Sequence, residues 1–370
     1  MPGIDSISRK ILYIISELGI NPSRFIELLR KNNFNLIKTI NFFCNKLNKF
    51  KSRKVDELIN YLIKNNINVL NIMGHDYPAI LKEIYFPPPL LFYKGDKIIK
   101  SKLNIAIVGT RKCSAYGIDV AKYISKQISS LDITIVSGLA NGIDSYAHQA
   151  ALEEKGGSIA VLGCGINIIY PPENEYLFEA IIHNGSLITE FLVDTPPLKH
   201  NFPQRNRIIS GISAGVIVIE AGDKSGALIT SEFALNQNRE VFAVPGSIFN
   251  SESKGCHTLI KNGAKLVNDI DDILDELNQY RELFYEKYKQ ESFYDTFKKD
   301  INFLKNPIFL DNLSDDQRKI INFIGFKPKS IEEIVNFSGF DVKKILKIIT
   351  ELEMMQLINE KNLNSYVRIK

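Results

Sequence analysis

Short apolar runs alternate with longer segments of helical spacing between residues 103 and 245. The runs have the length of buried strands and contain few polar residues, a pattern typical of a parallel sheet covered by helices on both faces. Strands are expected at Asn104–Val108, Ile133–Val136, Ile159–Leu162, Leu187–Thr189, Val216–Ile219 and Val241–Val244. This region is therefore predicted to be an α/β domain with a mostly parallel sheet.

Helical spacing of apolar residues dominates the N-terminal part of the chain instead. Residues 1–73 predict a small all-helical domain. Its helices are expected at Ser8–Leu18, Ser23–Lys31, Leu36–Lys46 and Val55–Lys64. The run Phe86-Pro87-Pro88-Pro89 cannot be helical, and the α/β pattern begins after it.

The last 65 residues predict a separate module. Three helices are expected at Leu313–Ile324, Ser330–Phe337 and Asp341–Leu352, followed by a hairpin at Leu357–Ile369. This is a winged-helix outline, in which the third helix would enter a DNA groove. The expected organisation is a helical domain (1–73), an α/β domain (74–290), a linker (291–305) and a winged-helix-like domain (306–370).

Glycine and hydroxyl residues follow the ends of the predicted parallel strands. In open parallel sheets, ligands bind outside the carboxyl ends of the strands. Glycine lets the backbone approach a ligand, and Ser and Thr add donors, which together suit phosphate. The turns contain Gly109-Thr110-Arg111, Ser137-Gly138, Gly163-Cys164-Gly165 and Ser225-Gly226. Helix packing alone would explain some of these glycines.

Two arginines stand near the start of a predicted helix. Pro203 fits the first position of that helix, so Arg205 and Arg207 lie at the positive end of its dipole, where a cation is disfavoured. An anion held there by backbone N–H groups and guanidinium groups would turn the repulsion into a binding site, and phosphate is the usual occupant. The alternative is that the arginines pair with carboxylates elsewhere in the fold.

Several kinds of site lose support. Neither G-x-G-x-x-G nor G-x-x-x-x-G-K-[ST] occurs in the expected places, which argues against dinucleotide and nucleoside triphosphate cofactors. Asp144 and His148 lie four residues apart and could form an acid–base pair. We expect instead that Asp144 helps to cap its helix and that His148 packs or hydrogen-bonds against a neighbouring turn.

Charge is distributed unevenly along the chain. The net charge is +4, but residues 1–100 carry 16 Lys and Arg against 8 Asp and Glu, whereas residues 101–305 carry 20 against 25. Contact with a polyanion in the middle of the chain therefore needs local placement of cations. A basic cluster with Phe50 embedded (Lys46, Lys49, Lys51, Arg53 and Lys54) is either a second nucleic-acid contact or a solvated helix end.

Composition narrows the class of protein. The four cysteines and five histidines are scattered, which favours neither a disulfide framework nor a zinc site. No apolar run reaches about 18 residues, and no charged-then-apolar leader is present. We therefore expect a cytoplasmic protein without a metal or cofactor and without a membrane span.

Five ordered motifs and one short strand segment resemble the DNA-processing protein DprA (Smf) family over roughly residues 76–270. They are GTRKCSAYG (109–117), SGLANGIDSYAHQAAL (137–152), AVLGCGINIIYPPEN (160–174), FPQRNRIISG (202–211), and EAGDKSGALIT (220–230) with VFAVPG (241–246). The upstream HDYPAILKEIYFPPPLLFYKGD is similar to the lead-in of that family. The chain departs modestly, with Thr110 where Ser is common and Cys164 inside the third turn.

The resemblance implies an extended Rossmann fold and a non-enzymatic role. Such a protein would bind and protect incoming single-stranded DNA, load the RecA recombinase in natural transformation or recombination, and act as a homodimer through the Rossmann domain. The implied DNA-binding residues are Gly109, Thr110, Arg111, Ser137, Gly138, Gly163, Gly165, Lys199, Phe202, Arg205, Asn206, Arg207, Ser225 and Gly226. Phe202 would stack on a base, and the cations would hold phosphates.

Two other functions remain open at this point. A nucleotide-processing enzyme of the phosphoribohydrolase type could use Glu190 or Glu220 at a strand end, although its G-G-x-G-T signature is absent and SGALITSE (225–232) is only distantly similar. A transcription regulator could act through the C-terminal module, but the 10 basic and 9 acidic residues of 306–370 leave that module nearly neutral.

Overall fold

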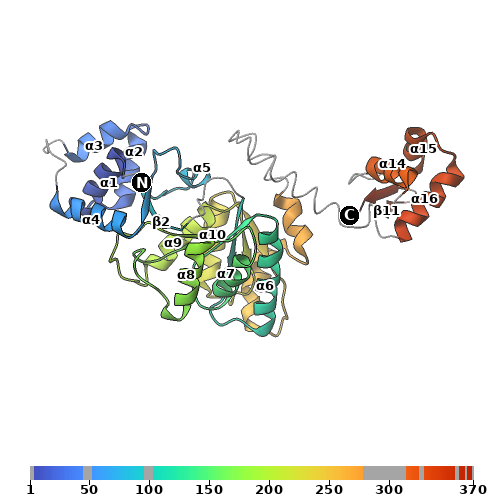
Figure 1. Cartoon of the computed structure of the whole chain (residues 1–370). Helices are drawn as coiled ribbons and strands as arrows, with labels where there is room; N and C mark the ends of the chain where they lie inside the picture. The colour runs from blue at the N-terminus through green and yellow to red at the C-terminus, as the bar shows by residue number, and fades with distance from the viewer. Residues whose placement is uncertain are drawn as a thin grey trace. The chain divides into compact units, whose positions relative to one another are not determined.

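The computed structural model describes residues 4–44, 52–95, 103–277, 314–324, 329–354, 358–362 and 365–368. The chain divides into two compact units, Met1–Tyr294 and Asp295–Lys370, each with its own buried apolar core (Figure 1). Most of the basic cluster, residues 46–51, and the expected linker at 291–305 lie outside the described residues.

In the described part of the first unit, nine strands form one sheet in the order β1-β2-β6-β5-β4-β3-β7-β8-β9. The predicted strands correspond to β3 (Asn104–Val108), β4 (Thr134–Ser137), β5 (Ser158–Val161), β6 (Gly185–Thr189), β7 (Gly215–Val218) and β8 (Glu240–Ala243). All of these pair in parallel, so the mostly parallel α/β sheet is confirmed.

Three strands that the apolar pattern did not predict extend this sheet. At one edge, β1 (Asn68–Asn71) pairs with β2 (Leu90–Lys94), and β2 pairs with β6, both antiparallel. At the other edge, β9 (Lys265–Leu266) pairs in parallel with β8. β1 has asparagine at both ends and β9 has only two residues, so neither shows a long apolar run. Both strands form through pairing with distant segments, which the apolar pattern does not record.

The direction of winding reverses at β3. The chain adds β4, β5 and β6 on one side of β3 and then returns to add β7, β8 and β9 on the other. Right-handed crossovers then place helices on both faces of the sheet. One face carries α6 (Ala115–Ser130), α7 (Ile143–Leu152) and α8 (Glu175–His183), and the other carries α9 (Asn201–Gly211) and α10 (Gly226–Asn236) (Figure 1).

This reversal decides where a ligand can enter. The ends of β3 and β7 are neighbours, and the Thr110 N–H donates to the Glu220 carbonyl at 2.7 Å between the turns that follow them. A crevice outside the carboxyl ends of two such strands is the usual ligand site of an open α/β sheet. The short η2 (Ser251–Ser253) and α11 (Lys254–Lys261) lead from β8 to β9 beside it.

The N-terminal helices pack onto the edge of the same sheet. They are α1 (Ser6–Ser16), α2 (Pro22–Lys31), α3 (Leu36–Cys44) and α4 (Arg53–Lys64), with the short α5 (Ala79–Lys82) after β1. Asp5, Asn21 and Ser52 accept hydrogen bonds from the first N–H groups of α1, α2 and α4, as N-caps do. The helical expectation for this region is therefore confirmed up to residue 64.

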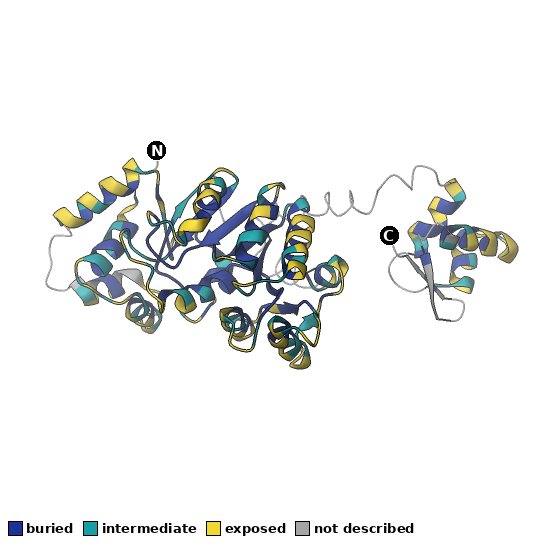
Figure 2. Cartoon of the chain, turned by 90° about the horizontal axis from the view of Figure 1, so that it is seen from below, coloured by how far each residue is buried: buried dark blue, intermediate teal, exposed yellow. Residues whose placement is uncertain are grey.

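One continuous apolar core joins these helices to the sheet. It runs from Ile11 and Phe25 in the helices to Phe92 in β2 and Val216 in β7, all buried. Figure 2 shows the sheet strands in dark blue, and the helices around them exposed on their outer sides. The polar groups available to a ligand are therefore those at the strand ends rather than those within the sheet.

The second unit has the predicted three helices and hairpin. They are α14 (Asp315–Ile324), α15 (Ile331–Ser338) and α16 (Val342–Met354), with β10 (Lys329–Ser330), β11 (Ile358–Asn362) and β12 (Ser365–Arg368) in the order β10-β12-β11. On α16, Lys344 pairs with Asp316 at 2.7 Å and Lys347 with Glu351 at 3.9 Å. Two lysines of the third helix of the winged-helix outline are thus paired with acids.

Candidate functional site

A cavity of about 940 Å³ opens where β3 and β7 end. Most of its lining comes from four segments, the turn after β3, the start of α9, the turn before α10 and the segment from η2 into α11, and the segments after β4 and β5 add Ala140, Asp144 and Tyr170. The cationic side chains among the described lining residues are Arg111, Lys112, Lys199, Arg205, Lys224 and Lys254, and the acidic ones are Asp144, Asp223 and Glu252. The cations exceed the acids, so the cavity favours an anionic ligand.

The structure brings most of the predicted site residues together. Gly109, Thr110, Arg111, Lys199, Phe202, Arg205, Asn206, Ser225 and Gly226 all line the cavity. The remaining predicted residues, Ser137, Gly138, Gly163, Gly165 and Arg207, are buried and do not line it. The cavity also contains residues that sequence reasoning missed, among them Lys112, Tyr170, Lys224 and Lys254.

Arg205 forms the floor of the cavity. Its guanidinium donates to the Gly138 carbonyl at 2.9 Å and to the Val161 carbonyl, and only 4% of the residue is exposed. Burial lowers the pKa of Arg205 to about 10, and the nearby Asp144 carboxylate opposes that shift, so the guanidinium stays charged at neutral pH. A Cβ at Gly138 would lie 2.6 Å from its Nη2 atom, which explains the glycine at this position.

Asp144 and His148 hold the turn after β4. Asp144 Oδ2 accepts from the Gly138 N–H at 3.0 Å, and His148 Nε2 accepts from the Leu139 N–H at 3.2 Å. The backbone of Leu139 is left-handed, with φ of 58°, so this conformation needs such support. The expectation for His148 is confirmed, whereas Asp144 holds the preceding turn rather than capping its own helix.

His148 is unsuited to proton transfer at neutral pH. Its Nδ1 lies 2.6 Å from Ser158 Oγ, and the ring is fully buried. Because Nε2 accepts from a backbone N–H, the ring proton is assigned to Nδ1. Burial, with a smaller contribution from Arg205, lowers the pKa of His148 to about 3, so the ring remains neutral.

This buried histidine predicts a loss of stability in acid. Below pH 6.5 the unfolded chain protonates His148 but the folded chain does not, so the free energy of unfolding falls as the pH falls. Between pH 6.5 and 4.5 this group contributes a loss of about 2 to 3 kcal/mol. Urea unfolding of the wild type and His148→Gln at pH 7.5 and 4.5 measures it. The variant should be less stable at pH 7.5, and the gap should narrow at pH 4.5; an unchanged gap would contradict the assignment.

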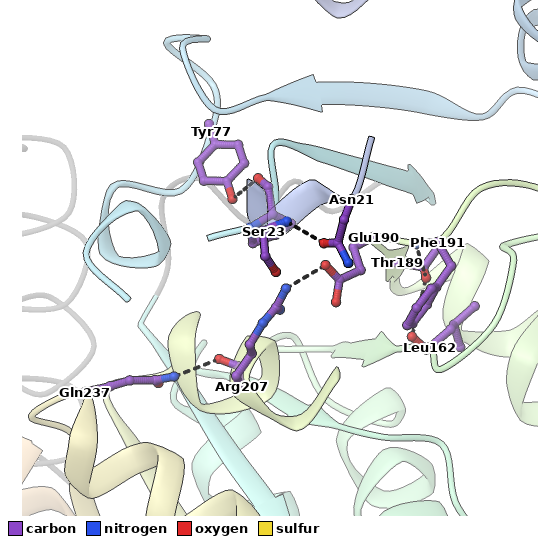
Figure 3. A network of polar contacts seen from close by, with 10 residues as sticks. Asn21, Ser23, Tyr77, Leu162, Thr189, Glu190, Phe191, Arg207 and Gln237 are labelled. Atoms are coloured by element: carbon purple, nitrogen blue, oxygen red, sulfur yellow. Dashed lines mark hydrogen bonds and ion pairs between the residues drawn. The ribbon is translucent and has the colours of Figure 1, made fainter. Parts of the chain in front are cut away.

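Arg207 corrects the prediction that both arginines face one pocket. It is buried on the other side of α9 and pairs with Glu190 Oε2 at 2.6 Å. Figure 3 shows its guanidinium pointing to Glu190, while its backbone carbonyl accepts from Gln237 at 3.0 Å. Residues two apart on a helix do not face the same way, so only Arg205 reaches the cavity. For Arg207, the alternative of pairing with an internal acid is the one observed.

Aromatic rings stand at the mouth of the cavity. Phe202 and Tyr170 lie with ring centroids 5.3 Å apart, and the Arg111 guanidinium carbon is 5.8 Å from the Phe202 centroid. A Cβ at Gly163 would lie 2.8 Å from the Phe202 ring, so this glycine makes room for the ring rather than for the ligand. An exposed cation beside two aromatic rings suits a ligand that carries a phosphate next to a flat ring that is free to stack on an aromatic side chain.

The two glutamates of the enzymatic alternative are occupied elsewhere. Glu190 pairs with Arg207, and the buried Glu220 accepts from the Ser114 N–H and Oγ at 2.9 and 2.6 Å and from Asn250 Nδ2 at 3.1 Å. Neither residue lines the cavity. Glu220 instead ties the turn that carries Arg111 to the segment after β8.

Comparison with protein families identifies the chain. Residues 68–278 match the family model described as DNA recombination-mediator protein A, which is more than half of the chain, and residues 310–361 match that of the DprA winged helix domain. This chain belongs to the DprA family of DNA recombination-mediator proteins. The resemblance inferred from the motifs is thereby confirmed, as is the winged helix of the second unit.

Known DprA proteins are similar over most of the chain. It is 47% identical to DNA processing protein DprA of Bacillus subtilis over 223 residues, which are 59% of this chain and 75% of that protein. It is 40% identical to protein Smf of Escherichia coli over 268 residues, or 72% and 71% of the two chains. The family model, which matches residues 68–278, includes the turns that line the cavity.

Solved DprA structures share the fold. That of Streptococcus pneumoniae aligns with a TM-score of 0.60 and 36% identity, covering 74% of this chain and 99% of the other. That of Helicobacter pylori, described with its single-stranded DNA binding mode, aligns with a TM-score of 0.53 and 27% identity over 58% and 96%.

Two features are absent from the described residues of this DprA chain. None of their helices combines the length and the apolar character needed to span a bilayer. Their His, Cys, Asp and Glu side chains form no group of three or more that could hold a metal ion.

Proposed function

We propose that this DprA family member binds single-stranded DNA in the cavity at the ends of β3 and β7. The observation that carries the proposal is the convergence of Arg111, Lys199 and Arg205 with Phe202 at one opening. Cations on phosphates supply affinity without regard to sequence, and an aromatic ring accepts any base because every base has a π-face. No cofactor or covalent step is required.

The cations differ in their roles. Arg205 is fixed by the Gly138 and Val161 carbonyls before a ligand arrives, so binding costs it little conformational entropy. Arg111 and Lys199 are exposed and can follow the path of a flexible backbone. Thr110, Asn206, Ser225 and Gly226 add hydroxyl, amide and backbone groups along the same wall. Arg207 does not face the cavity; its ion pair with Glu190 holds α9 from the opposite side of the helix.

The wider role follows from membership of a family of recombination mediators. We propose that the bound strand is protected in the cytoplasm and passed to the RecA recombinase, and that the protein acts as a homodimer through its α/β domain. We also propose that the helical domain ends at residue 73, the α/β domain at residue 290 and the linker at residue 305. Recombinase filament formation on an oligonucleotide, with and without the full chain, tests the loading step.

Competition between single-stranded and duplex DNA tests the binding itself. Unlabelled 20-nucleotide oligo-dT should displace a labelled strand from the full chain at a much lower concentration than a 20-base-pair duplex. The reason is that a duplex keeps its bases stacked and out of reach of Phe202 and Tyr170. With about three phosphate contacts, the logarithm of affinity should fall with the logarithm of salt concentration with a slope of about −2. Equal competition by the duplex would contradict the proposal.

A further inference from the structure

The segment after β8 presents two apolar side chains to solvent. Ile248 is 75% exposed and Phe249 is 94% exposed. Adjacent large apolar side chains at a loop tip are costly to hydrate, and exposed apolar patches commonly mark contact surfaces. Neither residue is needed for the core, because both point away from it.

The base of this loop is held by hydrogen bonds on both sides of the tip. Ser247 Oγ accepts from the Phe249 N–H at 3.3 Å, and the Ser247 carbonyl accepts from the Asn250 N–H at 3.0 Å. The Asn250 amide donates to Glu220 and accepts from the Glu252 N–H at 3.0 Å. The two apolar side chains are therefore presented from a defined position.

A groove lies beside the tip on the α6 side of the sheet. It has a volume of about 390 Å³ and is lined by Tyr116, Pro245, Gly246, Ser247 and Asn250. The Tyr116 hydroxyl donates to the Pro245 carbonyl at 2.8 Å, and the residue is 47% exposed. None of these lining side chains is charged, and a flat ring can pack on the phenol while its edge meets a hydroxyl and backbone groups.

Neighbouring segments of the chain line the groove and the cavity. Ser114, which Glu220 binds together with Asn250, belongs to the turn that carries Arg111 and Lys112 into the cavity. In the segment after β8, Asn250 lines the groove and the next residue, Ser251, lines the cavity. The two hollows thus share two chain segments, and the exposed Lys112 stands on one of them.

We propose that single-stranded DNA leaving the cavity crosses the rim at Lys112 and places a further base in this groove, between Tyr116 and Phe249. The inference rests on the proposed function and extends its DNA path beyond the cavity to the segment after β8. A polynucleotide suits the arrangement because a cation precedes an uncharged aromatic groove, which is the order of phosphate and base along a strand.

A single tryptophan tests this directly, because the chain contains none. In Phe249→Trp, saturating 20-nucleotide oligo-dT should quench the tryptophan emission, and a four-nucleotide oligo-dT, too short to leave the cavity, should not. Leu235→Trp is the matched control. Leu235 is 60% exposed near the C-terminal end of α10, whereas the cavity lies at the N-terminal end of that helix. Its emission should not change with either oligonucleotide.

Affinity provides the second measurement. Phe249→Ala should weaken binding of the 20-nucleotide strand about tenfold and leave the four-nucleotide strand unaffected. Tyr123→Ala, which removes another exposed aromatic from α6, should change neither. Unchanged tryptophan emission of Phe249→Trp while anisotropy shows saturation overturns the inference, as does equal weakening of both strands by Phe249→Ala.

Three further outcomes separate the explanations. A change in the molecular mass of Phe249→Ala without DNA would assign the loop to contact between two copies of the chain and overturn the inference. A wild-type chain that binds neither oligonucleotide would refute the proposed function itself, and the inference with it. A wild type that binds both, while the emission of Phe249→Trp responds to neither, would refute the inference alone.

Discussion

Replacing Arg111 and Lys199 together by alanine should lower the affinity for oligo-dT by about two to four orders of magnitude, since each charged contact contributes about 1.5 to 3 kcal/mol. Both side chains are exposed at the mouth of the cavity, so the fold should be unaffected. Fluorescence anisotropy at two salt concentrations measures the change. The variant should also show a shallower salt dependence, because two phosphate contacts are lost.

A charge-matched control separates this effect from net charge. Lys126→Ala with Lys265→Ala removes the same charge from surface pairs with Glu153 and Glu276, away from the cavity. Surface pairs of this kind contribute little, so both stability and affinity should stay close to the wild type. Equal loss of affinity in the two double variants would indicate that the cavity is not the binding site.

Arg207→Met should destabilise the fold by about 3 to 5 kcal/mol. The change leaves the Glu190 carboxylate buried without its partner, which is the costly way to break a buried ion pair. Burial already raises the pKa of Glu190, and Arg207 opposes that shift, so the variant should take up a proton there on folding. Chemical denaturation of the full chain measures the loss.

The double variant distinguishes support from binding. Arg207→Met with Glu190→Leu removes both charges and should recover most of the lost stability, because replacing a whole buried pair by apolar side chains is often neutral. Its affinity for oligo-dT should match that of the wild type. A stable double variant with weakened DNA binding would show instead that Arg207 contacts the ligand, as the sequence had indicated.

Arg207 also shows where inference from sequence stopped. The helix dipole predicts one binding site for both arginines, but residues two apart on a helix face different sides. A negative group does compensate for each cation at this helix start, as the dipole predicts. For Arg207 that group is Glu190, 17 positions earlier in the chain, and no local pattern joins the two.

The glycines of the strand-end turns show a different limit. Their spacing located the correct edge of the sheet, because turns at the carboxyl ends of parallel strands converge there. It could not tell a glycine that meets the ligand from one that makes room for a side chain. Gly138 and Gly163 are of the second kind, since they accommodate Arg205 and Phe202.

The strands were predicted well where burial alone determines them. The apolar runs of β3 to β8 are buried on both faces, so their pattern is sufficient. The edge strand β1 depends on its partner β2, and Lys254 reaches the cavity only because α11 packs beside β8. Such positions are set by contacts between distant segments, which a single sequence does not reveal.

The return of the chain to β3 has a consequence for biosynthesis. The cavity wall is assembled from positions as far apart as 109 and 254, so no nascent chain holds it until the ribosome has released the segment after β8. A ligand of this cavity binds only the folded sheet, because the unfolded or partly made chain lacks the cavity. Binding therefore stabilises the folded state by mass action. A growing chain is thereby kept from capturing nucleic acid until the segment after β8 has been made.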